Sequence, residues 1–524
     1  MRYIYSIVKA DYLQRTRSYG FLITLAITIY AAYSFVPPPS ASYTTLSIAG
    51  YKGVLNAAWV GHVSAMMTTI MLSLYGYFLI NTGIKKDIDT EVGLIIATTP
   101  ITNFGYLLSK FFSNFLVLLT IAGITFAVSI LMFFVRNSGY PFILADFVVP
   151  YLLFALPALF VVSALAIVGE VFLGGKSIFQ YLAFFMLFSI MLANIDKPSN
   201  KNKVVAIDLF GASTVTSSIK DKVNTQFHDD IKGISLGFIF SKQKPYKTFV
   251  WEGVSWTPLF MLSRLIWIAF GIALVYGSSF FFHRFDFKQP AGKKKKITAF
   301  ESTEKPVFAA TGISMASLPP VVNDYGIWPF IKTELLLLIR QGSKWFWLLT
   351  GGIWIGTCIA PLDIVHAYVL PVLWFLQVTR WSELATKEKT NRLHYFTWSS
   401  YKPLLRMLPA QVLAGVLIAV ALALPVMLRY LFAGNIIPVI NILNGSVFIV
   451  LLAVCLGIVS GGKKLFEILF FLLTYVVVEK IPVADYLGAV RHDQSGSYIT
   501  VMLMITAILG TISFVVRNYQ ARHL

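Results

Sequence analysis

The sequence predicts an all-α integral membrane protein with twelve transmembrane helices, arranged as two pseudo-repeated six-helix units. Three observations support this fold class: the composition, the number of apolar stretches, and short motifs that recur in both halves. Apolar residues make up 57% of the 524-residue chain and charged residues only 13%, against about 25% charged residues in typical soluble proteins. The mean hydropathy is +0.73. This composition excludes a soluble enzyme, a soluble nucleic-acid-binding protein and a secreted disulfide scaffold.

The predicted spans are apolar stretches of about the 20 residues that a helix needs to cross a membrane. In the N-terminal half they are residues 20–36, 57–80, 111–135, 147–168, 177–195 and 257–282. In the C-terminal half they are residues 345–360, 364–379, 407–428, 438–460, 465–478 and 498–516. No small-residue cleavage site follows the first stretch, so we expect it to stay in the membrane.

The distribution of basic residues predicts the orientation. The chain has 43 Lys and Arg against 24 Asp and Glu. A cytoplasmic N-terminus places most of these cations in short cytoplasmic segments, as the positive-inside rule requires, while the long loop 196–258 is exempt from that rule. We therefore expect a multi-pass protein of the bacterial plasma (inner) membrane with both termini in the cytoplasm.

Recurring motifs predict the domain organisation. VKAD at 8–11 and RTRSYGF at 15–21 match IKTE at 331–334 and RQGSKWF at 340–346, and GGKSIF at 174–179 matches GGKKLF at 461–466. We expect amphipathic cytoplasmic entry helices at 1–19 and 326–344, and permease-like units at 20–282 and 345–524. The extracytoplasmic loop 196–258 is expected to form a small cap, helical in part. The linker 283–325 contains four lysines at 293–296 that serve as a topology anchor or bind anionic headgroups.

The loop after the second span carries the most specific motif. Residues 85–100 read KKDIDTEVGLIIATTP and residues 106–110 read YLLSK. Pro100 would end a helix running from about Ile88 to Thr98. The apolar residues of this helix would need a protein groove as a partner.

This motif resembles the loop of ABC-2 type permeases, the membrane halves of one class of ATP-binding cassette exporters. The resemblance implies that the segment is a coupling helix that docks on an ATPase, with Glu91, Gly93, Thr99, Pro100 and Lys110 at the family's positions. The second half offers Glu388 but lacks the glycine and the Thr-Pro pair. The resemblance further implies two copies of a cytoplasmic ABC ATPase as partners, with ATP and Mg bound by those subunits and no cofactor in this chain.

The resemblance also implies a translocation path between the halves, formed by the second and fifth spans of each unit. Aromatic and methionine side chains are adaptable apolar contacts, so this lining would suit a lipid, a peptide or a drug-like molecule. Carried over to this chain, the lining residues are Met67, Met71, Tyr75, Phe184, Phe188, Trp374, Phe375, Gln377, Phe471 and Thr474.

The sequence contains no motif for catalysis or metal binding, so we do not expect this chain to be an enzyme. Residues 169–177 come nearest to a phosphate-binding loop, but Glu170 stands where the motif requires glycine. Glu170 and Glu467 lie near span ends and are expected to pair with Lys176 and with Lys463 or Lys464.

Two other functions remain open from the sequence. One is a secondary transporter driven by an ion gradient, although charged residues deep in the spans, which such coupling requires, are missing. The other is a membrane sensor or scaffold that transports nothing. In every case the surrounding partner is membrane lipid.

Overall fold

The computed structural model describes residues 2–38, 41, 43–48, 51–137, 139–174, 177–193, 208–228, 234–240, 247–282, 326–342, 344–478, 485–489 and 496–523. The linker 283–325, Lys176 and parts of the loop 196–258 lie outside the described residues. The expectations for the linker lysines and for a Glu170–Lys176 pair therefore concern residues that the structure does not describe.

Helices dominate both halves. The first half contains α1 (Arg2–Thr16), α2 (Tyr19–Phe35), α3 (Ala57–Ile80), α4 (Gly83–Asp89), α5 (Val92–Ala97), α6 (Asn103–Arg136), α7 (Ala145–Pro150), the π-helix η1 (Tyr151–Ala155), α8 (Leu156–Leu173), α9 (Ser177–Ala193), α11 (Ala212–Phe227) and α12 (Pro258–Phe281). The second half contains α13 (Trp328–Arg340), α14 (Lys344–Ile359), α15 (Leu362–Ile364), the π-helix η3 (Val365–Val369), α16 (Leu370–Phe375), α17 (Val378–Trp381), α18 (Lys387–Thr390), α19 (His394–Trp398), α20 (Pro403–Phe432), α21 (Ile436–Ser460), α22 (Lys464–Val478) and α23 (Gly496–Arg522).

Local capping explains where several long helices begin. Asn56, Thr102 and Thr257 each precede a helix in extended conformation, and each side chain accepts a hydrogen bond from a backbone N–H of the first turn. Such caps satisfy N–H groups that have no partner within the helix. Pro258 then occupies the first turn of α12, where its missing N–H costs nothing.

Seven helices among the described residues are long and apolar enough to cross a membrane, or eight if the bent pair Tyr3–Thr16 and Tyr19–Phe35 forms one span. Two shorter apolar helices are Ser177–Leu192 and Leu362–Phe375. The chain is therefore a multi-pass membrane protein, as the composition predicts. The count of twelve spans and the arrangement as two repeats remain predictions.

The structure contains a small β-sheet that the sequence analysis does not predict, so the all-α expectation is incomplete. Its strands β1 (Tyr43–Ile48), β2 (Tyr51–Gly53), β3 (Ile234–Phe240) and β4 (Lys247–Phe249) lie in the order β3-β1-β2-β4. The β1–β2 and β1–β3 pairs are antiparallel and the β2–β4 pair is parallel. The cap thus combines the 196–258 loop with residues between α2 and α3. Asn56 Nδ2 donates to the Trp251 carbonyl at 2.7 Å and ties this cap to the start of α3.

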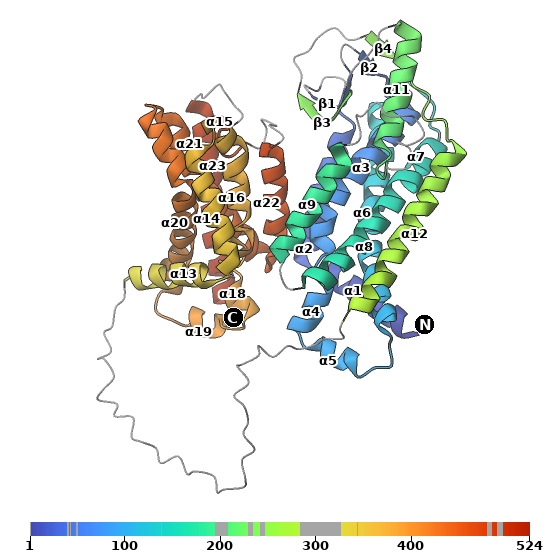
Figure 1. Ribbon diagram of the computed structural model, residues 1–524. Helices are drawn as coiled ribbons and strands as arrows, with labels where there is room; N and C mark the ends of the chain where they lie inside the picture. Colours follow the sequence, from blue (N-terminus) through green and yellow to red (C-terminus); the bar gives the residue numbers. More distant parts are fainter. Residues whose placement is uncertain are drawn as a thin grey trace, which may run out of the picture.

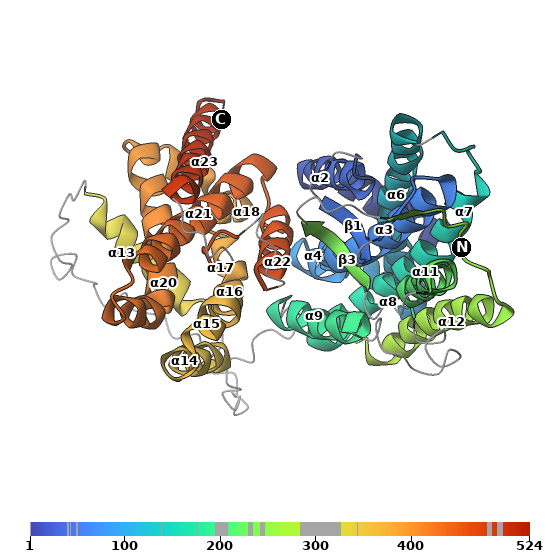
Figure 2. The same cartoon turned by 90° about the horizontal axis from the view of Figure 1, so that it is seen from above.

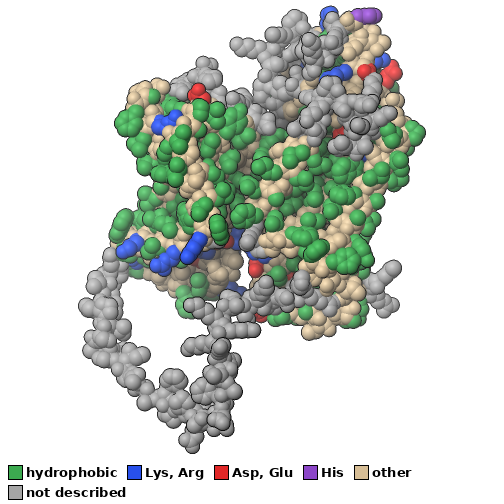
Figure 3. Space-filling model, viewed as in Figure 1, with side chains coloured by type: hydrophobic (Ala, Val, Ile, Leu, Met, Phe, Trp, Pro, Cys, Tyr) green, Lys and Arg blue, Asp and Glu red, His purple; other side chains and the backbone are tan. Residues whose placement is uncertain are grey.

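The two halves form two groups of helices that meet along α22 (Figures 1 and 2). Both termini lie at the end of the molecule opposite the sheet (Figure 1), which we call the terminal end. The helix pair α1 and α2 is bent by 69° there. Apolar side chains cover much of the outer surface of both groups (Figure 3), as expected for surfaces that face lipid.

Candidate functional site

The loop that carries the predicted coupling motif consists of two short helices at the terminal end, not one continuous helix. Helices α4 and α5 are separated at Glu91, whose backbone is left-handed with φ of 59°. Residues other than glycine rarely adopt this conformation. The predicted single helix from Ile88 to Thr98 is therefore wrong, because the chain turns sharply at Glu91.

The outer face of this loop is apolar and exposed. Ile88, Val92, Leu94 and Ile95 are all exposed, and Ile95 has 68% of its surface accessible. We call these four residues the first patch. Glu91 and Pro100 are also exposed, Thr99 is partly buried and Gly93 is buried. The first patch lies at the lower end of the first group of helices (Figure 1).

The inner face of the loop is held by Glu170 at the end of α8. One carboxylate oxygen accepts hydrogen bonds from the backbone N–H groups of Thr82 and Gly83 at 3.0 and 2.9 Å. The other accepts from Ile84 and Lys85 at 2.7 and 3.1 Å. Glu170 thus satisfies four N–H groups at the start of α4, where a negative charge also suits the helix dipole. The lysine partner predicted for Glu170, Lys176, lies outside the described residues.

Lys110 secures the same loop from α6. Its Nζ lies 2.7 Å from Asp11 of α1 and 2.7 Å from Asp87 of α4. Tyr106 donates its hydroxyl hydrogen to Asp87 at 2.7 Å. Because Lys110 is only 2% exposed, it binds α1 and α4 to each other and offers no surface to another protein. A coupling role for Lys110 would therefore act through the position of α1 and α4 and stays a prediction.

The second loop, formed by α18 and α19, is built on a similar plan. Arg392 separates the two short helices and has a left-handed φ of 56°. It follows Glu388 at the same distance along the chain as Glu91 follows Asp87. The structural counterpart of Glu91 is therefore Arg392, and Glu388 corresponds to Asp87. An alignment on the leucine pairs of the two halves misses this register because Leu404 follows Arg392 by four fewer residues than Leu107 follows Glu91.

Glu388 is also buried, with 3% of its surface exposed. It accepts a hydrogen bond from Gln411 of α20 and lies 3.6 Å from Arg517 of α23. Lys387 forms an ion pair with Glu334 of the entry helix α13. Burial raises the pKa of Glu388, and the charges of Arg517 and Lys387 partly offset this rise. Glu388 therefore stabilises the loop from within, like Asp87.

The outer face of the second loop is apolar as well. Leu393, Tyr395 and Phe396 are exposed, and Phe396 has 78% of its surface accessible. We call these three residues the second patch. Both patches lie at the terminal end of the molecule (Figure 1).

The residues predicted to line a path fall into two environments. The ring centroids of Phe184 and Phe188 of α9 are 6.2 Å apart, and those of Phe375 and Phe471 are 5.5 Å apart. The ring of Phe78 lies between them, with its centroid 6.4 Å from that of Phe184 and 4.0 Å from that of Phe471. These rings pack together where the two halves meet. The remaining predicted residues lie elsewhere in the helices or at the edges of this cluster: Met67, Met71, Tyr75, Trp374, Gln377 and Thr474.

Two of these residues are bound within their own half. Trp374 donates its indole N–H to the Ala419 carbonyl at 3.1 Å, and Tyr75 forms a 2.7 Å hydrogen bond with Thr28. The buried core contains the four phenylalanines together with Met67, Tyr75 and Trp374.

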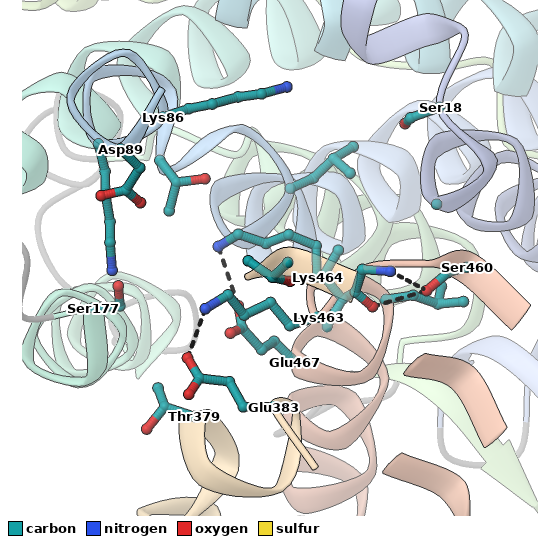
Figure 4. A pocket seen from close by; sticks show the side chains of 18 of the residues that line it. Ser18, Lys86, Asp89, Ser177, Thr379, Glu383, Ser460, Lys463, Lys464 and Glu467 are labelled. Atoms are coloured by element: carbon teal, nitrogen blue, oxygen red, sulfur yellow. Dashed lines mark hydrogen bonds and ion pairs between the residues drawn. The ribbon is translucent and has the colours of Figure 1, made fainter. Parts of the chain in front are cut away.

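A cavity of about 810 Å³ opens between the halves near the terminal end. Four of the matched motifs contribute to its wall: residues 15–21, 340–346, 174–179 and 461–466 each supply lining residues. Its charged lining residues are Arg15, Lys85, Lys86, Asp89, Arg380, Glu383, Lys463, Lys464 and Glu467. Figure 4 shows Lys86 and Asp89 on one side, with Lys463, Lys464 and Glu467 coming from the other half.

Two ion pairs occupy the second-half wall of this cavity. Lys463 lies 2.6 Å from Glu383, and Lys464 lies 3.1 Å from Glu467. The expected pairing of Glu467 with a lysine of the GGK turn is thereby confirmed. Tyr181 of α9 also donates to Glu467 at 2.7 Å, so this carboxylate joins the two halves.

No model of a known protein family, no curated protein and no solved structure matches this chain.

Proposed function

We propose that this chain is the transmembrane permease subunit of an ATP-driven exporter of the ABC-2 type. Two six-span permease units fused in one chain would move a hydrophobic or amphipathic substrate out of the cytoplasm or the inner leaflet. The protein would reside in a bacterial inner membrane with its terminal end in the cytoplasm. Separate ATPase subunits, each binding ATP and Mg, would supply the energy.

The observation that carries this proposal is the first patch. It is an apolar surface on short helices beyond the long apolar spans, and such a surface is typical of a site that binds another protein. The loop is fixed to α8 by Glu170 and to α1 and α6 by Lys110. A movement imposed on the patch would therefore reach three helices of the first half directly.

The second patch supports a pair of equivalent partner subunits, one for each loop. Both loops place exposed apolar residues beside a left-handed break, at Glu91 and at Arg392. We expect one copy of this chain to bind two ATPase subunits, one at each patch. Glu91 and Arg392 carry opposite charges at corresponding positions, so the two contacts would differ in their ionic partners.

The test is purification of this chain from its native membrane, followed by reconstitution with the P-loop ATPase that it retains. Ile95→Asp should reduce co-purification of the ATPase at least about tenfold, because a buried carboxylate without a partner costs several kcal/mol at an interface. The matched control is Tyr5→Asp, which places a charge at an exposed aromatic position on the entry helix α1, outside both patches. Its effect on membrane insertion is measured alongside.

Full ATPase binding and full transport-coupled ATP hydrolysis by the Ile95→Asp variant would contradict the proposal. Native mass spectrometry should show one copy of this chain with two ATPase subunits. Two copies of this chain for each ATPase pair would contradict the fused-unit arrangement.

A further inference from the structure

The cavity between the halves has an excess of positive charge. Of its charged lining residues, six are basic and three are acidic. Two of the acids are already committed to ion pairs, Glu383 with Lys463 and Glu467 with Lys464. The four cations that line it outside these pairs are Arg15, Lys85, Lys86 and Arg380.

These four cations form no salt bridge with any residue in the described part of the chain. Arg15 donates to the Asn114 side chain at 2.6 Å and to the Ile80 carbonyl at 3.2 Å, and both acceptors are neutral. Arg380 donates to the Gln377 side chain and the Gln341 carbonyl, which are also neutral. Arg380 is buried, and a buried guanidinium without an ion-pair partner is costly.

Arg380 also retains an unused donor. It is buried, and its Nε has no hydrogen-bond partner among the described residues. The rings of Phe346 and Trp347 pack on its guanidinium at 4.1 and 4.5 Å and hold its plane in place. A fixed guanidinium fork suits phosphate or carboxylate oxygens.

The remainder of the cavity wall contains both neutral polar residues and large apolar residues. Phe21 and Phe346 line it at the starts of α2 and α14, and Leu465 and Ile468 line it from α22. The cavity therefore combines a cationic part with an apolar part. Its volume of about 810 Å³ falls within the range of about 300–1,000 Å³ that is common for small-molecule sites.

The level of the cavity matches that of lipid headgroups. Tyr19 and Trp345 directly precede the lining residues Gly20 and Phe346, and both are strongly exposed. Exposed tyrosine and tryptophan residues at the ends of spans mark the boundary between hydrocarbon and water. The cavity is therefore placed where a headgroup could enter from the side of the membrane.

We propose that this cavity binds an amphiphile with an anionic, oxygen-rich headgroup, such as a phosphate-bearing lipid. The headgroup would lie against Arg15, Arg380, Lys85 and Lys86, and the first part of its chains against the apolar wall. Calling this ligand the transported substrate rests on the proposed function. Binding itself does not, so the test uses the purified full chain without an ATPase.

The experiment measures lipid retention by native mass spectrometry and affinity by titration in detergent. The probes are dioleoyl-phosphatidylglycerol, its phosphatidylcholine analogue of equal chain length, and inorganic phosphate. We expect the wild-type chain to bind phosphatidylglycerol at least about tenfold more tightly than phosphatidylcholine. Inorganic phosphate should compete only weakly, because it has no chains for the apolar wall.

The variant Lys85→Gln/Lys86→Gln should weaken phosphatidylglycerol binding about fivefold for each lysine, or about 25-fold together. Both side chains reach solvent, so their replacement leaves the core intact. The matched control Lys332→Gln/Lys344→Gln removes two exposed cations outside the cavity and should leave affinity unchanged.

Three results would overturn the proposal. Equal binding of the two lipids would show an apolar groove without headgroup recognition. Full competition by inorganic phosphate would show a site for a free anion. An equal loss in the control variant would show unspecific attraction to the basic surface.

Discussion

The two apolar patches at the terminal end sit on loops of similar plan that are held in different ways. In the first loop, Asp87 of α4 faces Lys110, which also reaches Asp11 in the entry helix. In the second loop, Glu388 of α18 accepts a hydrogen bond from the amide of Gln411 and forms an ion pair with Arg517 of α23. Gln411 follows Glu388 at the same distance along the chain at which Lys110 follows Asp87.

Glu170 has no counterpart in the second loop. It accepts four backbone hydrogen bonds and fixes the start of α4 to the end of α8. At the matched place before the second GGK turn lies Gly457, which packs against Thr386 and Ala385. The first loop is therefore bound to its helices by Glu170 and Lys110. The second is bound by the Lys387–Glu334 and Glu388–Arg517 pairs and by close packing at Gly457. This difference teaches that a shared plan for a docking loop does not require a shared set of contacts.

The largest expected effect comes from Lys110→Met. This change leaves Asp11 and Asp87 buried together without their cation, and breaking a buried pair in this way costs about 3–5 kcal/mol. We expect a marked fall in the thermal unfolding midpoint in detergent. Gln411→Met removes only an amide donor and should cost about 1–3 kcal/mol. An equal or greater loss for Gln411→Met would contradict the distinction between the loops.

A smaller, local effect is expected for Glu170→Gln. The amide keeps one acceptor oxygen but loses the charge that suits the start of α4, a change of about 1 kcal/mol. Hydrogen exchange at Thr82 to Lys85 should become about fivefold faster, with no change in the peptide that contains α18. Glu467→Gln is the matched control, because its carboxylate is buried nearby but binds side chains. Acceleration in both loops would indicate global loosening instead of a lost cap.

The sequence predicts the apolar helices well because burial in lipid leaves a strong compositional signal. It fails where partners lie far apart in the chain. In the sheet, β1 pairs with β3, although many helices separate the two strands along the sequence. Short strands also carry little periodic signal. The loop motif is visible in sequence, but the left-handed break at Glu91 is not.

Long-range contacts also decide which charged residues serve as anchors. In the sequence, Lys110 is part of a docking motif. In the structure, it forms ion pairs with carboxylates of α1 and α4. The neutral hydrogen-bond acceptors of Arg15 and Arg380 among the described residues likewise come largely from distant segments. A recurring Lys-acid pair, Lys86-Asp87 and Lys387-Glu388, was the available sequence signal for the register of the two loops.

The smallest expected effect is a pH dependence of stability that comes from Glu388 in the second loop. Burial raises the pKa of Glu388 above its ordinary value of 4.5, so the folded chain holds this proton more tightly than the unfolded chain. The stability that this linkage contributes is fully present below the ordinary pKa and is lost as pH rises through the folded-state pKa. Glu388→Gln cannot titrate, so the difference in unfolding midpoint between wild type and variant should shift in favour of the wild type on acidification. The measurement is thermal unfolding of both proteins between about pH 4 and pH 7, with Glu383→Gln as the control at a more exposed carboxylate. A constant difference across this range would show that folding does not change the pKa of Glu388. A shift against the wild type on acidification would show that Arg517 and Lys387 hold Glu388 in its ionised form. Either result would contradict the prediction.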